Sequence, residues 1–139
     1  MKQEFTEIKV STNGKGLIDV TEKIKAWAEK FGFHTGLLTL FVAHTSASLL
    51  IQENADPDVL HDMERFFSKL VPENDPDYRH TTEGSDDMPA HIRSALTQTQ
   101  LSIPLRNHRL ALGVWQGLYL YEHRRAPHTR TLLLHLIGE

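Results

Sequence analysis

The order of the predicted strands and helices restricts the fold of this chain more than any other feature of its sequence. Two strands precede the first helix, two more precede the second, and four follow a short third helix. Doubly wound parallel sheets need strands and helices that alternate, whereas clustered strands are typical of antiparallel sheets. The sequence therefore predicts an α+β architecture, with mostly antiparallel sheets backed by two main helices and one short helix. Its 139 residues fit a single domain, 1–139.

Apolar patterns predict the strands. In the first strand, Thr6, Ile8 and Val10 alternate with charged neighbours, as expected when one face is buried. Proline cannot donate a backbone hydrogen bond, so Pro104 places its strand at the edge of a sheet. The predicted strands are 6–10, 17–18, 37–42, 48–52, 101–105, 110–114, 116–121 and 131–137.

Three helices separate these strands. Apolar residues recur at helical spacing from Asp19 to Gly32, and a second series begins at Asp56-Pro57 and stops at Pro72. We expect Asp19, Asp56 and Asp87 to be N-caps, with the third helix ending near residue 96. The predicted apolar stripe of the second helix comprises Val59, Leu60, Met63, Phe66, Phe67 and Leu70.

Charge and composition exclude several classes of protein. The formal charge is −3, so no basic field exists to hold a nucleic acid backbone. The absence of cysteine excludes disulfide scaffolds, thiolate catalysis and cysteine-based metal sites. The longest apolar runs, Gly36–Ala43 and Leu132–Ile137, are too short to cross a membrane, and Met1–Val10 does not resemble a secretion signal. We therefore expect a cytoplasmic protein that binds neither nucleic acid nor membrane.

Nine histidines direct any chemistry towards imidazole groups. Four of them stand beside polar residues where an element begins or ends: His44, His80, His91 and His123. Two or three imidazoles and a carboxylate suffice for a Zn²⁺, Mn²⁺ or Fe²⁺ site, so we predict that these four converge in one metal-binding pocket. A polar turn at His44 and simple packing of His91 are the alternatives. The remaining histidines have structural explanations in turns, on surfaces or in strands: His34, His61, His108, His128 and His135.

The connection Glu73–Asp87 is long, polar and acidic, with six carboxylates. Connections of this length in a compact domain are usually functional or disordered. Its last five residues offer oxygen ligands for Mg²⁺ or carboxylates that orient other ligands; a solvated loop is the alternative. Elsewhere, the hydroxyls of Thr45 and Ser46 and the guanidinium of Arg124 are suited to phosphate oxygens.

Several longer motifs resemble the signatures of the YjbQ family. The motifs are HTSASL from His44 with ENADP from Glu53, EGSDDMPAHI from Glu83, and GVWQGLYLYEHR from Gly113. The segment His61–Phe67 also resembles the family's second helix. The resemblance covers essentially the whole chain. It implies an α+β fold of two packed sheets with helices, assembled as a homotrimer, with the four selected histidines in a polar cleft.

Members of this family are often labelled secondary thiamine-phosphate synthases, and the resemblance implies the corresponding transfer reaction. A thiazole phosphate nitrogen would attack the methylene carbon of a hydroxymethylpyrimidine diphosphate, with loss of pyrophosphate. We expect a divalent metal, Zn²⁺ or Mg²⁺, held by His44, His80, His91 and His123. The expected catalytic residues are His44, His91, His123 and Glu83, and the expected substrate-binding residues are Thr45, Ser46, Asp86, Gln116 and Arg124.

Two alternatives belong to other classes. In a metal-dependent hydrolase, a divalent ion on three histidines would activate water, and Glu53 or Glu83 would be the base. In a non-catalytic trimer, the imidazoles would only bind a phosphorylated metabolite. Metal analysis followed by product analysis distinguishes the three hypotheses.

Overall fold

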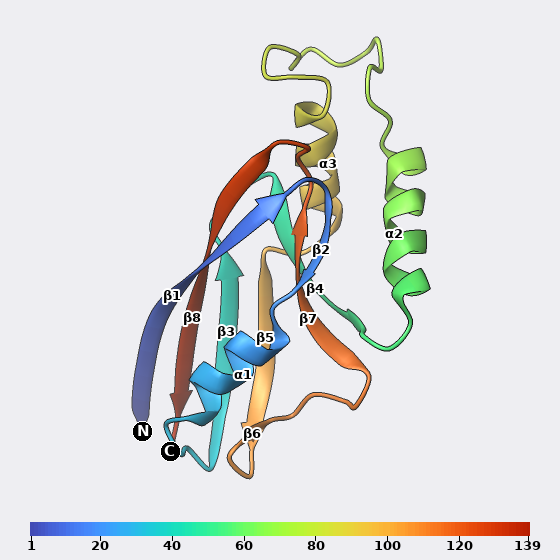
Figure 1. Cartoon of the computed structure of the whole chain (residues 1–139). Helices are drawn as coiled ribbons and strands as arrows, with labels where there is room; N and C mark the ends of the chain where they lie inside the picture. Colours follow the sequence, from blue (N-terminus) through green and yellow to red (C-terminus); the bar gives the residue numbers. More distant parts are fainter.

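The computed structural model describes residues 1–139 and contains eight strands and three helices (Figure 1). The elements are β1 (Lys2–Asn13), β2 (Gly16–Asp19), α1 (Thr21–Glu29), β3 (Thr35–Val42), β4 (Ala47–Glu53), α2 (Pro57–Leu70), α3 (Asp87–Leu96), β5 (Gln100–Arg106), β6 (Arg109–Leu110), β7 (Gln116–Glu122) and β8 (Pro127–Gly138). They form a five-stranded sheet of order β1-β8-β3-β5-β6 and a three-stranded sheet of order β2-β7-β4. All pairings are antiparallel, which confirms the predicted α+β class with two sheets.

The two sheets pack against each other through one apolar core of 19 buried residues. Alternate residues of β3 and β8 supply much of it, because successive side chains point to opposite faces of a strand. Leu38 and Leu40 of β3 meet Leu49 of β4 and Leu120 of β7 in this core. Helix α1 adds Ile24 and lies across the lower part of the same layer, as Figure 1 shows.

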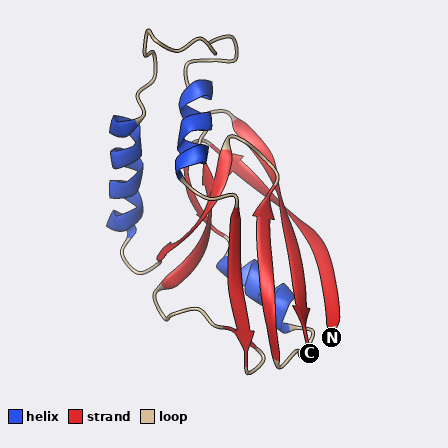
Figure 2. Ribbon diagram, turned by 180° about the vertical axis from the view of Figure 1, so that it is seen from behind, coloured by secondary structure: helices blue, strands red, loops and turns tan.

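Helices α2 and α3 lie on the other side of the three-stranded sheet (Figure 2). Phe67 of α2 packs edge-on against Tyr121 of β7, and Arg93 of α3 contacts the same ring. These contacts bury the outer face of β7, where every residue from 117 to 122 is buried. The start of α3 and the end of β7 therefore meet at one end of the molecule.

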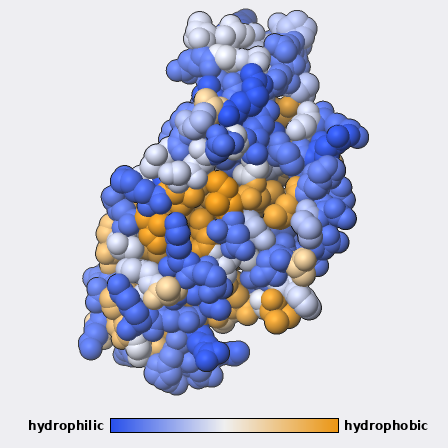
Figure 3. All heavy atoms as spheres, in the orientation of Figure 1, coloured by the Kyte–Doolittle hydropathy of each residue, from blue (hydrophilic) through white to orange (hydrophobic).

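The outer face of the five-stranded sheet is not covered. The strand register places Phe5 opposite His135, Leu37 opposite Ile137 and Phe41 opposite Leu133, all on this face. Phe5 is 60% exposed, and Leu37 is 40% exposed. Figure 3 shows the molecule in the orientation of Figure 1. Apolar residues gather in the middle of this view, above α1, and the upper end is largely hydrophilic.

Helix α2 begins as predicted, but its apolar stripe does not enter the core. Asp56 is the N-cap and accepts a hydrogen bond from the Asp58 N–H, and proline follows at the first helical position. No residue of α2 is buried, and Phe66 is 60% exposed. Helix α2 is held by Phe67 and by Glu64, which accepts hydrogen bonds from Arg93 and Tyr121.

Other local predictions were wrong in detail. The predicted strand 110–114 is reduced to the two residues of β6, because the chain turns away after Leu110. Val20 and Asp86, not Asp19 and Asp87, are the N-caps of α1 and α3. Asp19 instead accepts two hydrogen bonds from Thr21. Pro104 lies in β5, next to the short edge strand β6, and its carbonyl accepts a hydrogen bond from the Ala111 N–H.

No helix of the structure is long and apolar enough to cross a membrane.

Candidate functional site

Two histidines and an aspartate meet where the acidic loop joins α3. Asp87 and His91 are four residues apart on α3 and so share one helix face, while His80 comes from the loop. The Nε2 atom of His80 lies 2.6 Å from Asp87 Oδ2, and the Nε2 atom of His91 lies 3.3 Å from the same oxygen. One ligand atom from each residue lies within 4.8 Å of the others. We call His80, Asp87 and His91 the triad.

The second ring nitrogen of His91 is also oriented. Its Nδ1 atom lies 3.1 Å from the carbonyl oxygen of Thr45, which can only accept, so His91 donates from Nδ1. In the neutral form of the ring the lone pair is then on Nε2, which faces Asp87. Metal-binding histidines commonly donate their other N–H to a carbonyl or carboxylate in this way. His91 is thus prepared to bind a cation through Nε2.

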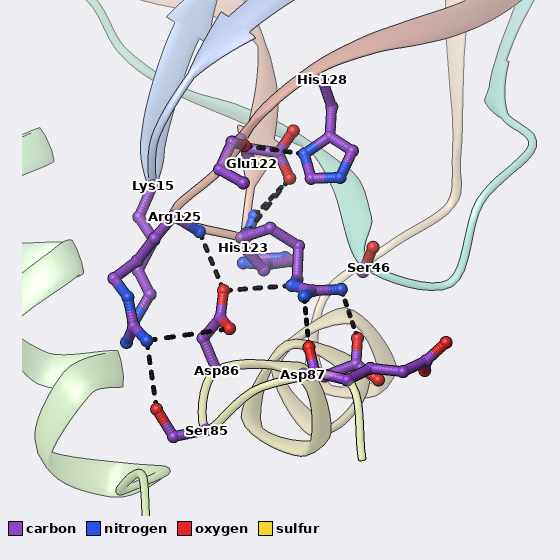
Figure 4. A network of polar contacts seen from close by, with 12 residues as sticks. Lys15, Ser46, Ser85, Asp86, Asp87, Glu122, His123, Arg125 and His128 are labelled. Atoms are coloured by element: carbon purple, nitrogen blue, oxygen red, sulfur yellow. Dashed lines mark hydrogen bonds and ion pairs between the residues drawn. The ribbon is translucent and has the colours of Figure 1, made fainter. Parts of the chain in front are cut away.

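Arg124 fixes the carboxylate of the triad. Its Nη1 donates to Asp87 Oδ1 at 2.6 Å, its Nε donates to Asp86 Oδ2 at 3.0 Å, and its Nη2 donates to the Glu83 carbonyl. The backbone N–H of Arg125 also donates to Asp86. Figure 4 shows Asp86 beside Asp87 at the start of α3. Oδ2 of Asp87 consequently points away from Arg124 and towards the two imidazoles.

The charge state of Asp87 follows from these contacts. Burial alone would raise the pKa of Asp87, whose side chain is 3% exposed. Hydrogen bonding with His80 and Glu83, with the charge of Arg124, outweighs burial and lowers the pKa. Glu83 lies beside the triad, with Oε2 3.1 Å from His80 Nε2 and a side chain that is 64% exposed. Helix α3 therefore supplies one fixed carboxylate, and the loop supplies one accessible carboxylate.

His44 lies near the triad but both of its ring nitrogens are engaged. Arg130 Nη1 lies 3.0 Å from His44 Nε2, and the Ser46 backbone N–H and hydroxyl lie at 3.0 and 3.1 Å from Nδ1. A backbone N–H and a guanidinium can only donate, and a neutral imidazole accepts at one nitrogen, so either Ser46 or Arg130 occupies its lone pair. Burial and the charge of Arg130 lower the pKa of His44. His44 is therefore a neutral imidazole whose lone pair is already occupied by a donor of the protein.

Arg130 itself belongs to a buried ion pair. Its Nη2 donates to Glu122 Oε2 at 2.6 Å and its Nε donates to Oε1, and neither side chain is more than 3% exposed. Thr12 also donates to Glu122, and Ser46 accepts from Arg130. Burial would raise the pKa of Glu122, but the hydrogen bonds from Arg130 and Thr12 lower it. This network supports the turn that carries His44.

His123 is fully buried and lies outside the triad. Its Nδ1 accepts from Arg93 Nε at 3.2 Å, and its Nε2 lies 2.8 Å from the Ser48 hydroxyl. Burial, followed by the charges of Arg93 and Arg130, lowers the pKa of His123 to about 3. The ring is thus neutral, donates from Nε2 and has no lone pair to offer a metal.

A cavity of about 310 Å³ adjoins the triad through His91. His44 and Thr45 line it from the turn after β3, and Ser94 and Thr99 line it from α3 and the segment that follows. None of its lining residues is acidic. We call this space the hydroxyl cavity.

The structure brings together part of the predicted site. His80, His91, Glu83 and Asp86 lie in or beside the triad, Arg124 supports it, and His44 and Thr45 line the hydroxyl cavity. Ser46 is buried beneath His44 and bound to Arg130. His123 is not part of this group. Gln116 begins β7, about 20 Å along the strand from Glu122 at its other end, and its side chain accepts from the Gly113 N–H.

Three functional residues were missed or given another role. Asp87 was expected mainly as a helix cap, although its spacing to His91 could have indicated a shared ligand face. Arg130 occupies the inward register of Leu132 and Leu134, and a charge in that position predicts a buried partner. No sequence signal indicates that Arg93 would reach His123.

Comparison with known proteins places the chain in one family. A model of the family described as UPF0047 protein YjbQ-like matches residues 6–139. The UPF0047 protein sll1880 of Synechocystis is 58% identical over 94% of this chain and 88% of its own length. The YjbQ protein of Escherichia coli O157:H7 is 44% identical over 94% of both chains.

Solved structures agree with these matches. A crystal structure of an uncharacterised YjbQ/UPF0047 protein from Clostridium acetobutylicum has a TM-score of 0.87 and 34% identity, covering 95% of this chain and 99% of that one. The hypothetical protein APE1520 of Aeropyrum pernix gives a TM-score of 0.89 and 30% identity over 98% and 99%. The sequence motifs, the two-sheet fold and these relatives agree, and the chain belongs to the YjbQ (UPF0047) family.

Proposed function

We propose that this protein is a metal-dependent hydrolase that acts on a small phosphorylated molecule. The observation that carries the proposal is the triad, in which two imidazole Nε2 atoms face one oxygen of a carboxylate that Arg124 holds in place. Such a constellation is typical of catalytic metal sites with positions open to water and substrate. The ions and the reaction below follow from this donor set.

The donor set fits a transition metal better than Mg²⁺. Mg²⁺ prefers oxygen ligands, whereas two imidazoles and a carboxylate suit Zn²⁺, Mn²⁺ or Fe²⁺. A cation would replace the present contact between His80 Nε2 and Asp87 Oδ2, and the 43% exposure of the His80 side chain leaves room for that movement. We therefore assign the metal to His80, Asp87 and His91. His44 and His123 are not assigned to it, because donors of the protein occupy their lone pairs: Ser46 or Arg130 at His44, and Arg93 at His123.

The side chains around the triad have separable roles. A bound divalent cation would supply Lewis-acid chemistry, since it polarises phosphoryl oxygens and lowers the pKa of water. Glu83 is accessible beside His80 and can accept the proton of an attacking water. Thr45 and Thr99 offer hydroxyl donors in the hydroxyl cavity to the oxygens of a phosphate group, whereas the hydroxyl of Ser94 already donates to the Ala47 carbonyl.

The positions of the arginines favour hydrolysis over transfer with loss of pyrophosphate. A leaving diphosphate needs cations that neutralise its developing charge. Arg93, Arg124 and Arg130 each bind carboxylates of the protein, and Arg124 has all three of its nitrogens engaged. None of the three faces the hydroxyl cavity as a free guanidinium. A single phosphate group bound to a cation places a smaller demand on the protein.

Metal analysis with matched variants tests the assignment. Untagged wild-type protein should retain about one equivalent of Zn²⁺ or Mn²⁺, and His80→Ala and His91→Ala should each lose it. His61→Ala changes an exposed histidine of α2 and should leave the metal content unchanged, as should His123→Gln. Metal that persists in both triad variants, or is lost from His123→Gln while that protein is folded, contradicts the assignment.

A kinetic assay then tests the reaction. The metal-loaded wild type should release inorganic phosphate from small phosphate monoesters, and Glu83→Gln should lower kcat by about 10²- to 10⁴-fold without loss of metal. Phosphate release that Glu83→Gln leaves unchanged removes Glu83 from the mechanism. Ligand binding with no release would instead favour the non-catalytic alternative. Release of pyrophosphate from hydroxymethylpyrimidine diphosphate in the presence of thiazole phosphate would favour transfer.

We also propose the homotrimer that the family resemblance implies. The supporting feature is the uncovered sheet face with Phe5, Leu37 and Phe41, because contiguous exposed apolar residues are typical of interaction surfaces. Light scattering should give three times the chain mass of 15.9 kDa. Phe41→Glu should yield smaller species, and an unchanged trimer in that variant would exclude this face.

A further inference from the structure

A second cavity touches the triad through His80, whereas the hydroxyl cavity touches it through His91. The second cavity has a volume of about 140 Å³ and is lined by the acidic loop, by His80 and by Met88 of α3. We call it the loop cavity. His80 belongs to both the triad and the loop cavity, while His91 belongs to both the triad and the hydroxyl cavity. The triad thus lies between two separate spaces.

The size of the loop cavity limits its occupant. A cavity of about 150 Å³ admits a molecule as large as benzene, and each water in the liquid takes about 30 Å³. The 140 Å³ available here therefore fits a group of about six non-hydrogen atoms. This is too small for a nucleoside and suits a short polyol or a single small ring.

The lining of the loop cavity consists mainly of uncharged hydrogen-bonding groups. Tyr78 donates its hydroxyl to the Pro72 carbonyl at 2.9 Å, which leaves its oxygen free to accept. Burial and the neighbouring Asp75 carboxylate raise the pKa of Tyr78, so the phenol keeps its proton. The side chains of Asn74 and Thr81 make no hydrogen bond within the protein.

The remaining groups decide which charge the cavity accepts. Ser85 accepts from Arg125 through its hydroxyl oxygen and can still donate. Asp75 is the only carboxylate in the lining, and no lysine or arginine lines it. A second phosphate or a carboxylate would meet no cation there except at His80. Hydroxyl groups, which both donate and accept, match this lining best.

We infer that the loop cavity binds the hydroxylated organic part of the substrate, while its phosphate group lies at the triad and the hydroxyl cavity. This inference rests on the proposed function and gives it a substrate class, the phosphate monoesters of small polyols. Thr81 and Ser85 determine specificity in this arrangement. They contact the organic part alone, so their removal affects selection between substrates rather than binding of phosphate itself.

Calorimetry on Mn²⁺-loaded protein provides the test, with inorganic phosphate and the phosphonate analogue of glycerol 3-phosphate, which cannot be hydrolysed, as the two probes. Wild type should bind the phosphonate at least tenfold more tightly. Thr81→Val removes one hydroxyl at nearly constant shape and should weaken that affinity about three- to tenfold, as expected for one hydrogen bond, without changing the affinity for phosphate. Thr129→Val, on an exposed part of β8, is the matched control and should change neither affinity.

Two outcomes would overturn the inference. One is equal affinity of wild type for both probes, and the other is equal weakening of both by Thr81→Val. Ser85→Ala, whose loss of discrimination should be similar, replaces Thr81→Val if that variant does not fold by circular dichroism.

A metal-independent measurement separates this inference from the proposed function. Titration with glycerol alone should shift the amide resonances of Gly84 and Ser85 in a saturable way, and Thr81→Val should weaken the effect. Protein that binds no metal but shows these shifts would refute the hydrolase and retain the loop cavity. Protein that binds metal and phosphate but shows no such shifts would refute the role of the loop cavity and retain the hydrolase.

Discussion

Replacement of the buried His123 by glutamine should make the stability of the protein less sensitive to acid. The pKa of His123 is about 3 in the folded chain and about 6.5 in an unfolded one. Between these values the unfolded chain binds one more proton, so the free energy of unfolding decreases as the pH falls. The decrease is about 1.4 kcal/mol per pH unit, or about 2 kcal/mol from pH 6.5 to pH 5.

Glutamine preserves the hydrogen bonds but cannot titrate. Its amide nitrogen can donate to Ser48, and its oxygen can accept from Arg93, as the two nitrogens of His123 now do. At pH 7.5 the free energy of unfolding of the variant should be about 1–2 kcal/mol lower than that of wild type, because the shorter amide fits less well. Between pH 7.5 and pH 5, however, the free energy of unfolding of the variant should fall by about 2 kcal/mol less than that of wild type.

Urea unfolding at both pH values, followed by tryptophan fluorescence, measures this difference directly. Other groups with shifted pKa values, including His44, Asp86 and Glu122, remain in both proteins and cancel in the comparison. Equal losses of stability in wild type and His123→Gln would refute the reasoning. They would mean that His123 is protonated in the folded chain, against the contact that Arg93 makes with it.

Further predictions follow from the same contacts. Arg124→Ala should weaken metal binding about 10- to 100-fold, because Asp87 loses the group that orients it, and calorimetry that gives an unchanged Kd would contradict this. Glu122→Ala should lower the free energy of unfolding by about 3–5 kcal/mol, since the buried Arg130 would lose its counter-charge; a loss below about 1 kcal/mol in urea would show that the pair is dispensable. Gly36→Ala should lower the free energy of unfolding by about 1–3 kcal/mol, because the added Cβ would lie 2.6 Å from the Ile137 carbonyl oxygen. Gly113→Ala is the control, since its Cβ would meet only the flexible Gln116 side chain. Equal melting temperatures for the two variants would contradict the steric argument.

Most of the fold could be predicted because it depends on local patterns. Asp56-Pro57 sets the start of α2, and the apolar runs 37–42 and 132–137 give β3 and β8. Local patterns do not give the partner of an apolar face. Phe66 and Phe67 are equivalent in the sequence, yet Phe67 meets Tyr121 and Phe66 is exposed. Only the tertiary arrangement distinguishes them.

The site was predictable in its residue types and less so in its geometry. His80 and His91 were selected because they stand beside polar residues where an element begins or ends, and the triad contains both. His123 was selected on the same grounds, but the arginine that occupies its lone pair comes from α3, 30 residues earlier. Arg124 was expected to hold a substrate anion and instead holds Asp86 and Asp87. These roles depend on contacts with charged side chains that are distant in the sequence. The spacing of residues along the chain does not predict such contacts.

The placement of β8 between β1 and β3 has a consequence for biosynthesis. Lys9 and Thr131 contact each other although they are 122 positions apart, and β1 has no other strand beside it in the sheet. During translation the first strand therefore emerges long before its only neighbour exists. Its unpaired edge is available to chaperones or to other nascent chains throughout that interval. Pairing of β1 with β8 closes a loop that spans most of the chain. The folding rate should therefore depend on this late pairing step.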